Sequence, residues 1–403
     1  MRVLAVMPGI SPSTVINVMT PIKLLGEQGR IDAVIRLEQE TSPADVAAAD
    51  VLVLCRNTEP IYKPIIDLAL ELGIPLIDDL DDNVLAAPKG SESYYYHTHP
   101  ARKAHYEWIL RHVNLIRVHA PALADIVRVY NPNVALRWAA VDWSLAPPEL
   151  PALDPEITHI VYAAQRETGL KLFQQMRADL ETLLARHGER VRLHFLGFNP
   201  PELCGHPSVI CHPFDNDYPS FFRKFTHFGY AIGLAPMLDD EFHNCKTNIK
   251  FRDYAAAGAA GIYADVPLFN RNGVIDGETG LLVSGQPGTW LAAIERLMAD
   301  RALLEGIRQR ARAYAKDRYA EDRVLDAWMQ DLAALPTRPP ITAEKQAEIA
   351  ALEWWFQGLK GKDNPLVARV RRVLRGIVPM RAKLIYYDVR HEFVKWRASG
   401  RSR

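Results

Sequence analysis

The stretch CKTNIKFRDYAAAG, from Cys245 to Gly258, places two lysines and an aspartate where they could bind an anion. If a helix begins at Thr247, then Lys246, Lys250 and Asp253 follow at spacings of four and three and lie on one face. Acidic residues normally occupy the positive end of a helix, so lysines there indicate that an anion binds to them. The alternative is a solvated face with a weak Lys250–Asp253 pair.

Acidic side chains also gather in the stretch IPLIDDLDDNV, at the end of a predicted buried strand. They are Asp78, Asp79, Asp81 and Asp82. Clustered carboxylates repel, so they need a cation, protonation or good hydrogen bonds. The DDxxD spacing imitates a magnesium motif of all-helical prenyl-transferring enzymes, and the DxD spacing imitates metal-dependent transferases with a single sheet domain. Neither suits the pattern of elements described below, and a structural alternative is that the aspartates cap the turn from Asn83 onward.

Histidines and cysteines do not complete a metal site in this sequence. The stretch YYYHTHP offers His97 and His99, but no third ligand stands near them. The stretch CGHPSVICH spreads its two cysteines and two histidines over a predicted loop and a short strand, and these are Cys204, His206, Cys211 and His212. We therefore predict no metal.

Short β-rich runs alternate with helical patterns along the chain, beginning with RVLAVM, IDAVIRL and ADVLVLC. Such alternation predicts an α/β fold with parallel sheets and crossover helices. Prolines gather at 147–155 and the alternation then restarts, so we expect one Rossmann-like domain over 1–150 and a second over 151–335, followed by a helical segment over 336–403. Two such domains side by side leave a cleft, and ligands bind at the carboxyl ends of the strands.

The composition limits the classes of protein to consider. The chain has 403 residues, 48% of them hydrophobic, and a formal net charge of zero, which gives no sign of nucleic-acid binding. Its four cysteines form no CxxC pair, which favours a reducing compartment. No apolar run approaches the length of a membrane span or a secretion signal. We expect a cytoplasmic protein.

The order of elements around Cys245–Gly258 resembles the donor-binding region of retaining glycosyltransferases with the GT-B fold, family 4 and its relatives. The resemblance covers about residues 158–335. In this family an acidic residue stands five positions before a glycine, as Asp253 does before Gly258, and a DGxxGLLV signature follows, here from Asp276 onward. An earlier acidic residue of the family is replaced by Cys245, and Glu241 in the preceding loop is a possible substitute. The stretch FHNCKTNIKFRD is similar to a variant of the family that carries a Lys-Ser pair.

The resemblance implies roles for the residues of the second domain. Asp253 would accept hydrogen bonds from the ribose of a nucleotide-sugar donor, and Lys246 and Lys250 would face its diphosphate. The other donor-binding candidates are Arg166, Lys171, Thr247, Asn248 and Gly258. Negative charge builds on the diphosphate as it leaves, and ammonium groups with helix N–H dipoles can stabilise that charge without a metal. No cofactor is implied, since the nucleotide sugar is a substrate.

The resemblance also implies that the first domain binds the acceptor. Asp81 and Asp82 would contact the acceptor or the transferred sugar. The loop PGISPST has one glycine, so Ser11 would donate hydrogen bonds there in place of a glycine-rich loop. His97 and His99 are further acceptor-side candidates.

The last part of the chain is basic, because 359–403 holds 13 Lys and Arg against 3 Asp and Glu. Apolar residues recur there at helical spacing, which is typical of an amphipathic cationic helix at an anionic membrane surface. The alternative is that these apolar faces pack on the first domain. We therefore expect a retaining, metal-independent hexosyltransferase in bacterial polysaccharide or lipid-linked glycan assembly, peripheral on the inner membrane face. A non-catalytic sugar-nucleotide-binding scaffold and a nucleotide-sugar 2-epimerase are the alternatives.

Overall fold

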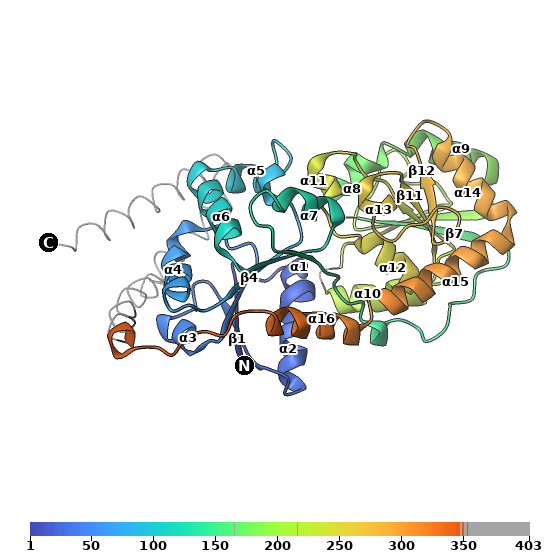
Figure 1. Ribbon diagram of the computed structural model, residues 1–403. Helices are drawn as coiled ribbons and strands as arrows, with labels where there is room; N and C mark the ends of the chain where they lie inside the picture. Colours follow the sequence, from blue (N-terminus) through green and yellow to red (C-terminus); the bar gives the residue numbers. More distant parts are fainter. Residues whose placement is uncertain (165, 216, 347–348, 350–352, 354–403) are drawn as a thin grey trace. The chain divides into compact units, whose positions relative to one another are not determined.

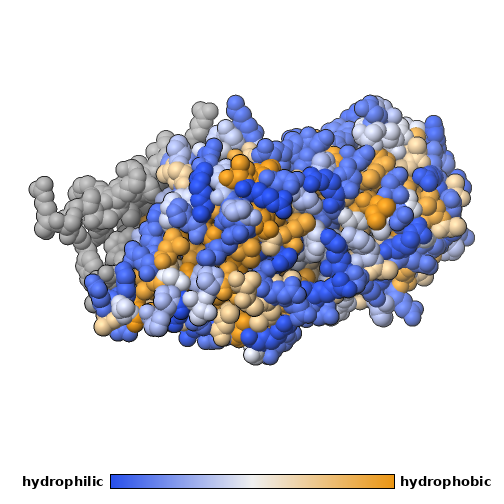
Figure 2. Space-filling model, in the orientation of Figure 1, coloured by the Kyte–Doolittle hydropathy of each residue, from blue (hydrophilic) through white to orange (hydrophobic). Residues whose placement is uncertain are grey.

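The computed structural model describes residues 1–164, 166–215, 217–346, 349 and 353, and these form two compact α/β units (Figure 1). The first unit contains Met1–Val118, Ala124–Leu136 and the described residues from Ala327 onward. The second contains His119–Leu123 and Arg137–Asp326. On the face seen in Figure 2, hydrophilic and apolar residues are interspersed over the surface. The expected α/β class is confirmed, because each unit has a parallel sheet of six strands.

The sheet of the first unit has the strand order β2-β1-β3-β4-β5-β6. Its strands are β1 (Arg2–Met7), β2 (Asp32–Leu37), β3 (Val51–Leu54), β4 (Leu76–Leu80), β5 (Leu115–Val118) and β6 (Val134–Leu136). Strands β1 and β3 are buried almost throughout and apolar on both faces, as a parallel sheet between two helix layers requires. The helices with bounds inside this unit are α1 (Pro12–Thr14), α2 (Thr20–Glu27), α3 (Pro43–Ala48), α4 (Lys63–Glu71), α5 (Glu92–His97) and α6 (Pro100–His112).

The sheet of the second unit has the order β12-β11-β10-β7-β8-β9. Its strands are β7 (Thr158–Ala163), β8 (Val191–Leu196), β9 (Val209–His212), β10 (Ile232–Ala235), β11 (Ala260–Ala264) and β12 (Leu281–Val283). Its helices are α8 (Arg166–Phe173), α9 (Arg177–His187), α10 (Tyr218–His227), α11 (Glu241–Asn244), α12 (Ile249–Ala257), α13 (Pro267–Asn270), α14 (Thr289–Ala299) and α15 (Arg301–Arg318). One continuous core of aliphatic and aromatic residues fills the space between this sheet and its helices.

Helix α16 (Glu321–Ala333) brings the chain back to the first unit, earlier than residue 336. The Arg117 guanidinium of β5 lies 3.5 Å above the ring of Trp328 and forms an ion pair with Asp331. Further on, Arg338 donates to Asp50 at 3.1 Å, and the red-orange end of the described chain lies beside α3 in Figure 1. The basic segment 359–403 lies outside the described residues, and none of the described helices is long and apolar enough to cross a membrane.

Candidate functional site

Each sheet has a point at which the direction of strand addition reverses. In the first unit the chain adds β2 on one side of β1 and β3 on the other. In the second unit it adds β8 and β9 on one side of β7 and β10 on the other. Ligands of open parallel sheets bind outside the carboxyl ends of the strands at such a reversal. The residues that follow β1, β3, β7 and β10 are therefore the candidates.

In the second unit the reversal lies between Ala163, the last residue of β7, and Ala235, the last residue of β10. The two strands are level, since Ile232 pairs with Ile160. The chain after β7 enters α8 at Arg166, whose side chain lies outside the description. The chain after β10 leads through α11 to α12. The structure thus brings α8 and the lysine-containing turn before α12 to the same edge of one sheet.

Helix α12 begins at Ile249, two residues later than the spacing suggests. The reason is Asn248, which precedes the helix with φ −78° and ψ 40° and is 2% exposed. Its amide nitrogen donates to the Tyr319 hydroxyl at 2.7 Å and to the Asn272 carbonyl at 2.7 Å. This long-range network fixes a non-helical residue where the sequence predicts helix. The Asn248 side chain is therefore used inside the unit, and a contact of Asn248 with a donor stays a prediction.

Lys246 lies in the turn ahead of α12, not on the helix, so the prediction of one shared face is wrong for this lysine. Its ammonium nitrogen lies 4.3 Å from the centre of the Phe242 ring. Thr247, the next residue, is half-buried in the same turn. Only Lys250 and Asp253 share a face of α12, one turn apart.

Lys250 and Asp253 form the charged centre of this site. Asp253 is 6% exposed, and the Tyr218 hydroxyl lies 3.5 Å from its Oδ1 atom. Burial lowers the pKa of Lys250, and its attraction to Asp253 only partly offsets this. Burial likewise raises the pKa of Asp253, against the opposing effects of Lys250 and Arg252. Both ionic forms are therefore poorly solvated here, and a ligand with polar groups would supply the interactions that water does not.

Lys171 lies close enough to Asp240, the residue that caps α11, for its charge to affect the pKa of that carboxyl. Asp240 caps α11 by accepting from the His243 N–H at 2.9 Å, and its Oδ1 atom lies 2.8 Å from His243 Nδ1. Partial burial raises the pKa of Asp240, but the bonds from His243 and the charge of Lys171 outweigh this and lower it. Lys171 itself is exposed on the last turn of α8. A predicted donor-side lysine thus lies near the approach to α12.

Two other residues of the family pattern, Gly258 and Asp276, have local structural roles. Gly258 ends α12 in the left-handed conformation with φ 68°, and a Cβ there would lie 2.6 Å from Leu150. It lies at the opposite end of the helix from Lys250. Asp276 closes its own loop by accepting from the Leu282 N–H at 2.9 Å. Cys245, at the position of the missing family acid, has no exposed surface, whereas Glu241 is exposed in the first turn of α11.

In the first unit the reversal lies between β1 and β3. The loop after β1 is held by reciprocal bonds, since the Ser11 N–H donates to Thr14 Oγ1 at 2.8 Å and the Thr14 N–H donates to Ser11 Oγ at 3.2 Å. Ser11 is partly buried in this turn. The loop after β3 begins with Cys55 and Arg56.

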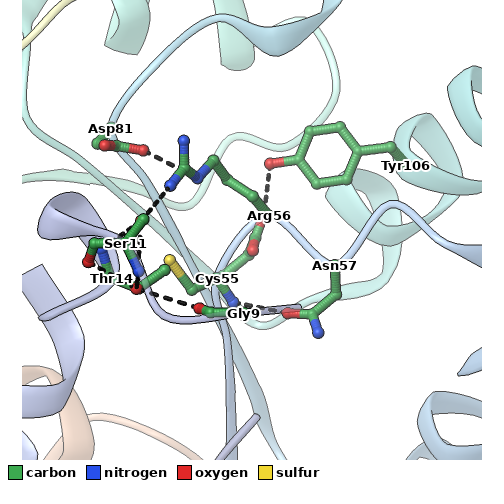
Figure 3. Close-up of polar contacts among 9 residues, drawn as sticks. Gly9, Ser11, Thr14, Cys55, Arg56, Asn57, Asp81 and Tyr106 are labelled. Atoms are coloured by element: carbon green, nitrogen blue, oxygen red, sulfur yellow. Dashed lines mark hydrogen bonds and ion pairs between the residues drawn. The ribbon is translucent and has the colours of Figure 1, made fainter. Parts of the chain in front are cut away.

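Arg56 joins three loops at this edge of the sheet (Figure 3). Its Nη2 atom donates to Ser11 Oγ at 3.3 Å, and its Nε atom lies 3.2 Å from Asp81 Oδ1, beyond the end of β4. Burial lowers the pKa of Arg56, but the negative groups around it, Asp81 foremost, together outweigh this and raise it, so the guanidinium is charged. Among the described non-glycine residues, Arg56 alone has a positive φ, 57°. A strained residue at a strand end is characteristic of functional sites.

The four clustered aspartates have different surroundings. Asp78 is fully buried with a pKa raised to about 7 by burial, although the Tyr106 hydroxyl donates to it at 3.0 Å. Asp79 is paired with Arg117 at 3.2 Å. Asp81 is 3% exposed, and Asp82 is half-buried. Asp81 is thus the aspartate that faces Arg56.

His97 lies near Arg56, in the last turn of α5. Burial, together with the charges of Arg56 and Arg102, lowers its pKa to about 4. The ring is therefore neutral at physiological pH, and its buried Nδ1 atom has no hydrogen-bond partner among the described residues. His99 is half-buried directly before α6. Within the described residues no three His, Cys, Asp or Glu side chains are grouped to hold a metal ion.

Arg56 and Tyr218 were not among the predicted site residues. Arg56 stands in the stretch VLVLCRNTEP, directly after an apolar strand, and this was the available signal. What the sequence did not reveal is that β3 lies beside β1. Tyr218 comes from α10, 35 residues before Asp253, and no spacing rule connects the two.

No protein-family model matches the sequence, and no curated protein matches it by sequence. Solved structures do match. Anabaena HepE in complex with UDP is 13% identical, with a TM-score of 0.59 over 83% of this chain and 100% of that chain. Sucrose-phosphate synthase from Thermosynechococcus elongatus is 13% identical, with a TM-score of 0.61 over the same shares. A glycosyltransferase from Rickettsia africae is 12% identical, with a TM-score of 0.55 over 82% of this chain and 97% of that chain. These likenesses confirm that the chain has the expected GT-B fold.

Proposed function

We propose that this protein is a retaining, metal-independent glycosyltransferase that transfers a sugar from a nucleoside-diphosphate sugar to a glycan or lipid-linked acceptor. The second unit binds the donor in this proposal, and the first unit contributes Arg56, Asp81 and His97 toward the acceptor. Solved structures of the same fold support the donor class, because HepE was crystallised with UDP and with UDP-glucose.

The proximity of Lys250 and Asp253 on one face of α12, at the strand reversal of the second unit, is the observation that carries the proposal. The pair combines one cation for a diphosphate with one carboxylate for the hydroxyls of a ribose. Asp253 is buried and Lys250 is half-buried, so bonds to a ligand would cost only part of the loss of water that exposed groups would suffer. As the diphosphate leaves, its growing negative charge would be stabilised by Lys250, by Lys246 and by the free N–H groups of α12.

Binding of uridine, UMP and UDP to three variants tests the donor site. Lys250→Ala is expected to weaken UDP about tenfold or more and to leave uridine nearly unchanged, because its partner is the diphosphate. Asp253→Asn is expected to weaken all three ligands by a similar factor, because its partner is the ribose. Lys224→Ala is the matched control, since Lys224 is an exposed lysine that pairs with Asp215 on the surface. Isothermal titration calorimetry measures the affinities, and unchanged UDP binding in both site variants contradicts the proposal.

A non-catalytic nucleotide-sugar-binding subunit is the second candidate, and Cys245 favours it. The thiol stands where relatives carry an acidic residue, and it is fully buried. Product analysis separates the two candidates. Release of UDP from UDP-glucose in the presence of acceptors indicates a transferase, whereas binding without turnover indicates the subunit, and conversion of the sugar itself indicates an epimerase.

We also propose that the basic segment 359–403 attaches the protein to an anionic membrane surface, where a lipid-linked acceptor of a polysaccharide would lie. This rests on the sequence, because the segment lies outside the described residues. Sedimentation with vesicles of anionic and of neutral lipid compares the full chain with a chain that ends at Gln357. Equal sedimentation of the two chains with anionic vesicles contradicts the attachment.

A further inference from the structure

Two cysteine thiols lie together at the edge of the second unit. The Sγ atoms of Cys204 and Cys211 are 3.8 Å apart. Cys204 is exposed, and Cys211 is half-buried on β9, the edge strand of the sheet. The other two cysteines, Cys55 and Cys245, are buried.

The backbone before and after Cys204 explains why the two thiols meet. The Cys204 and Leu203 N–H groups both donate to the Pro200 carbonyl, at 3.0 and 3.1 Å, which curls the chain at this point. Gly205 follows with φ 94°, a conformation that a side chain would strain, and no atom stands where its Cβ would be. The Val209 N–H then donates to the His206 carbonyl at 2.9 Å and starts β9. The thiol pair is thus held by backbone bonds on both sides of the turn.

We propose that Cys204 and Cys211 are an oxidation site that takes a low-molecular-weight disulfide and closes an internal disulfide bond. An S–S bond is about 2.05 Å long, so the two sulfur atoms need to approach by less than about 2 Å. A metal is a poorer match, because a tetrahedral zinc site takes four ligands and the described residues group no three of the required kind.

The reaction has two exchange steps. The Cys204 thiolate, which is the exposed one, attacks one sulfur of the small disulfide and releases one small thiolate. The Cys211 thiolate then attacks Cys204 Sγ and releases the second. Two protein thiols are oxidised, one small disulfide is reduced to two thiols, and the protons of the protein thiols pass to the departing thiolates.

The second step depends on pH. Burial and the neighbouring Cys204 thiol raise the pKa of Cys211 to about 11. Only the thiolate attacks, so ring closure should quicken as the pH rises from 7 toward 9. The closed bond would tie the loop from Gly197 to Ser208 to β9. That loop also contacts the turn after α8, because Glu202 accepts from Gln174 at 2.9 Å.

Treatment of the native full chain with glutathione disulfide tests the site. After alkylation of remaining thiols, intact-mass and peptide mass spectrometry are expected to show a Cys204–Cys211 bond, no retained glutathione and unmodified Cys55 and Cys245. Backbone amide exchange in the loop 197–208 should slow on closure and recover with dithiothreitol. None of these measurements requires a sugar donor, so they stand apart from the proposed activity.

Two variants identify the order of the steps. Cys211→Ser should stop at a stable glutathione adduct on Cys204, and Cys204→Ser should leave Cys211 largely unmodified. Cys204 is on an exposed turn, so its replacement leaves the fold intact, as circular dichroism can verify. Accumulation of a glutathione adduct on Cys204 in the natural sequence, without closure at pH 9, overturns the proposal, and so does the absence of any reaction at Cys204.

Discussion

The Nε atom of Arg56 lies 3.2 Å from the Oδ1 atom of Asp81, and the same guanidinium donates to the hydroxyl of Ser11. One side chain thereby joins the loops that follow β1, β3 and β4. The Asp81 side chain is nearly fully buried, and that of Arg56 is about a fifth exposed at 21%. The backbone of Arg56 is in the left-handed region, which costs a non-glycine residue about 1 kcal/mol or more. The pair thus stabilises a strained backbone.

Replacement of Arg56 separates the charge from the strain. Arg56→Ala should destabilise the protein by about 3 kcal/mol, because it leaves the Asp81 carboxylate buried without its cation. Arg56→Gly loses the same charge but relieves the backbone, so it should be about 1 kcal/mol more stable than Arg56→Ala. Urea unfolding at pH 7 measures both. If the glycine variant is the less stable of the two, the positive φ is not a source of strain.

A second substitution measures how much of the stability lost in Arg56→Ala is due to the unpaired Asp81 carboxylate. In the double variant Arg56→Ala with Asp81→Asn, no charge is left unpaired, and part of the lost stability should return. A double variant that is as unstable as the sum of the single changes would show that the two side chains do not act on each other.

The alternation of short apolar runs and helical patterns was sufficient to predict two parallel α/β units, because each element is encoded by its own residues. The order of the strands was not predictable, since it depends on which strands pair in space. Arg56 was missed for that reason, because only the adjacency of β1 and β3 identifies its loop. The start of α12 was misplaced for a related reason. Asn248 bonds to Tyr319, 71 residues away, and no local pattern reveals this contact.

Substitution of Asn248 tests whether its side chain stabilises the fold or binds the donor. Asn248→Ala should destabilise the protein by about 2–3 kcal/mol, because it leaves the buried Tyr319 hydroxyl and Asn272 carbonyl without their donor. Tyr319→Phe removes a single bond and should cost about 1 kcal/mol. Thermal unfolding measures both, and Thr247→Ala, in the half-buried turn beside it, is the control. A loss of UDP affinity in Asn248→Ala without loss of stability would instead support the predicted donor contact.

The raised pKa of Glu38 predicts that the stability of the protein depends on pH. Burial raises its pKa to about 8, although the Asn57 amide donates to it at 2.7 Å. The folded protein therefore keeps a proton on Glu38 that the unfolded chain loses above pH 4.5, so this residue lowers stability as the pH rises from about 4.5 to 8. Glu38→Gln removes that effect. The difference in free energy of unfolding between Glu38→Gln and the natural sequence should therefore shift in favour of the variant as the pH rises from 5 to 8. The shift should be up to about 1.4 kcal/mol per pH unit.

Glu40→Gln is the matched control for Glu38, since Glu40 is an exposed glutamate two residues away. It should change the pH dependence little. Parallel stability curves for Glu38→Gln and the natural sequence would mean that Glu38 is ionised in the folded protein at neutral pH.

Three histidines on adjacent strands of the second unit form a hydrogen-bonded row. His159 Nδ1 lies 2.9 Å from His194 Nε2, and His194 Nδ1 lies 3.1 Å from His212 Nε2. The rings of Phe228 and Tyr230 pack against His194. Burial, the two neighbouring histidines and Arg192 lower the pKa of His194 to about 3. At one end of the row, burial lowers the pKa of His159, and the charge of Asp154 partly offsets this. At the other end, burial lowers the pKa of His212.

The row should make the protein sensitive to acid. The unfolded chain binds a proton on each histidine below about pH 6.5, whereas folded His194 stays neutral until about pH 3. Stability is therefore lost as the pH falls through this range, by up to about 1.4 kcal/mol per pH unit for His194 alone. His194→Phe keeps the packing and cannot be protonated, so its unfolding free energy should fall less steeply between pH 6.5 and pH 4.5. His227→Gln, which changes an exposed histidine, should keep the slope of the natural sequence. Equal slopes in all three proteins would show that His194 takes up a proton in the folded state as readily as in the unfolded chain.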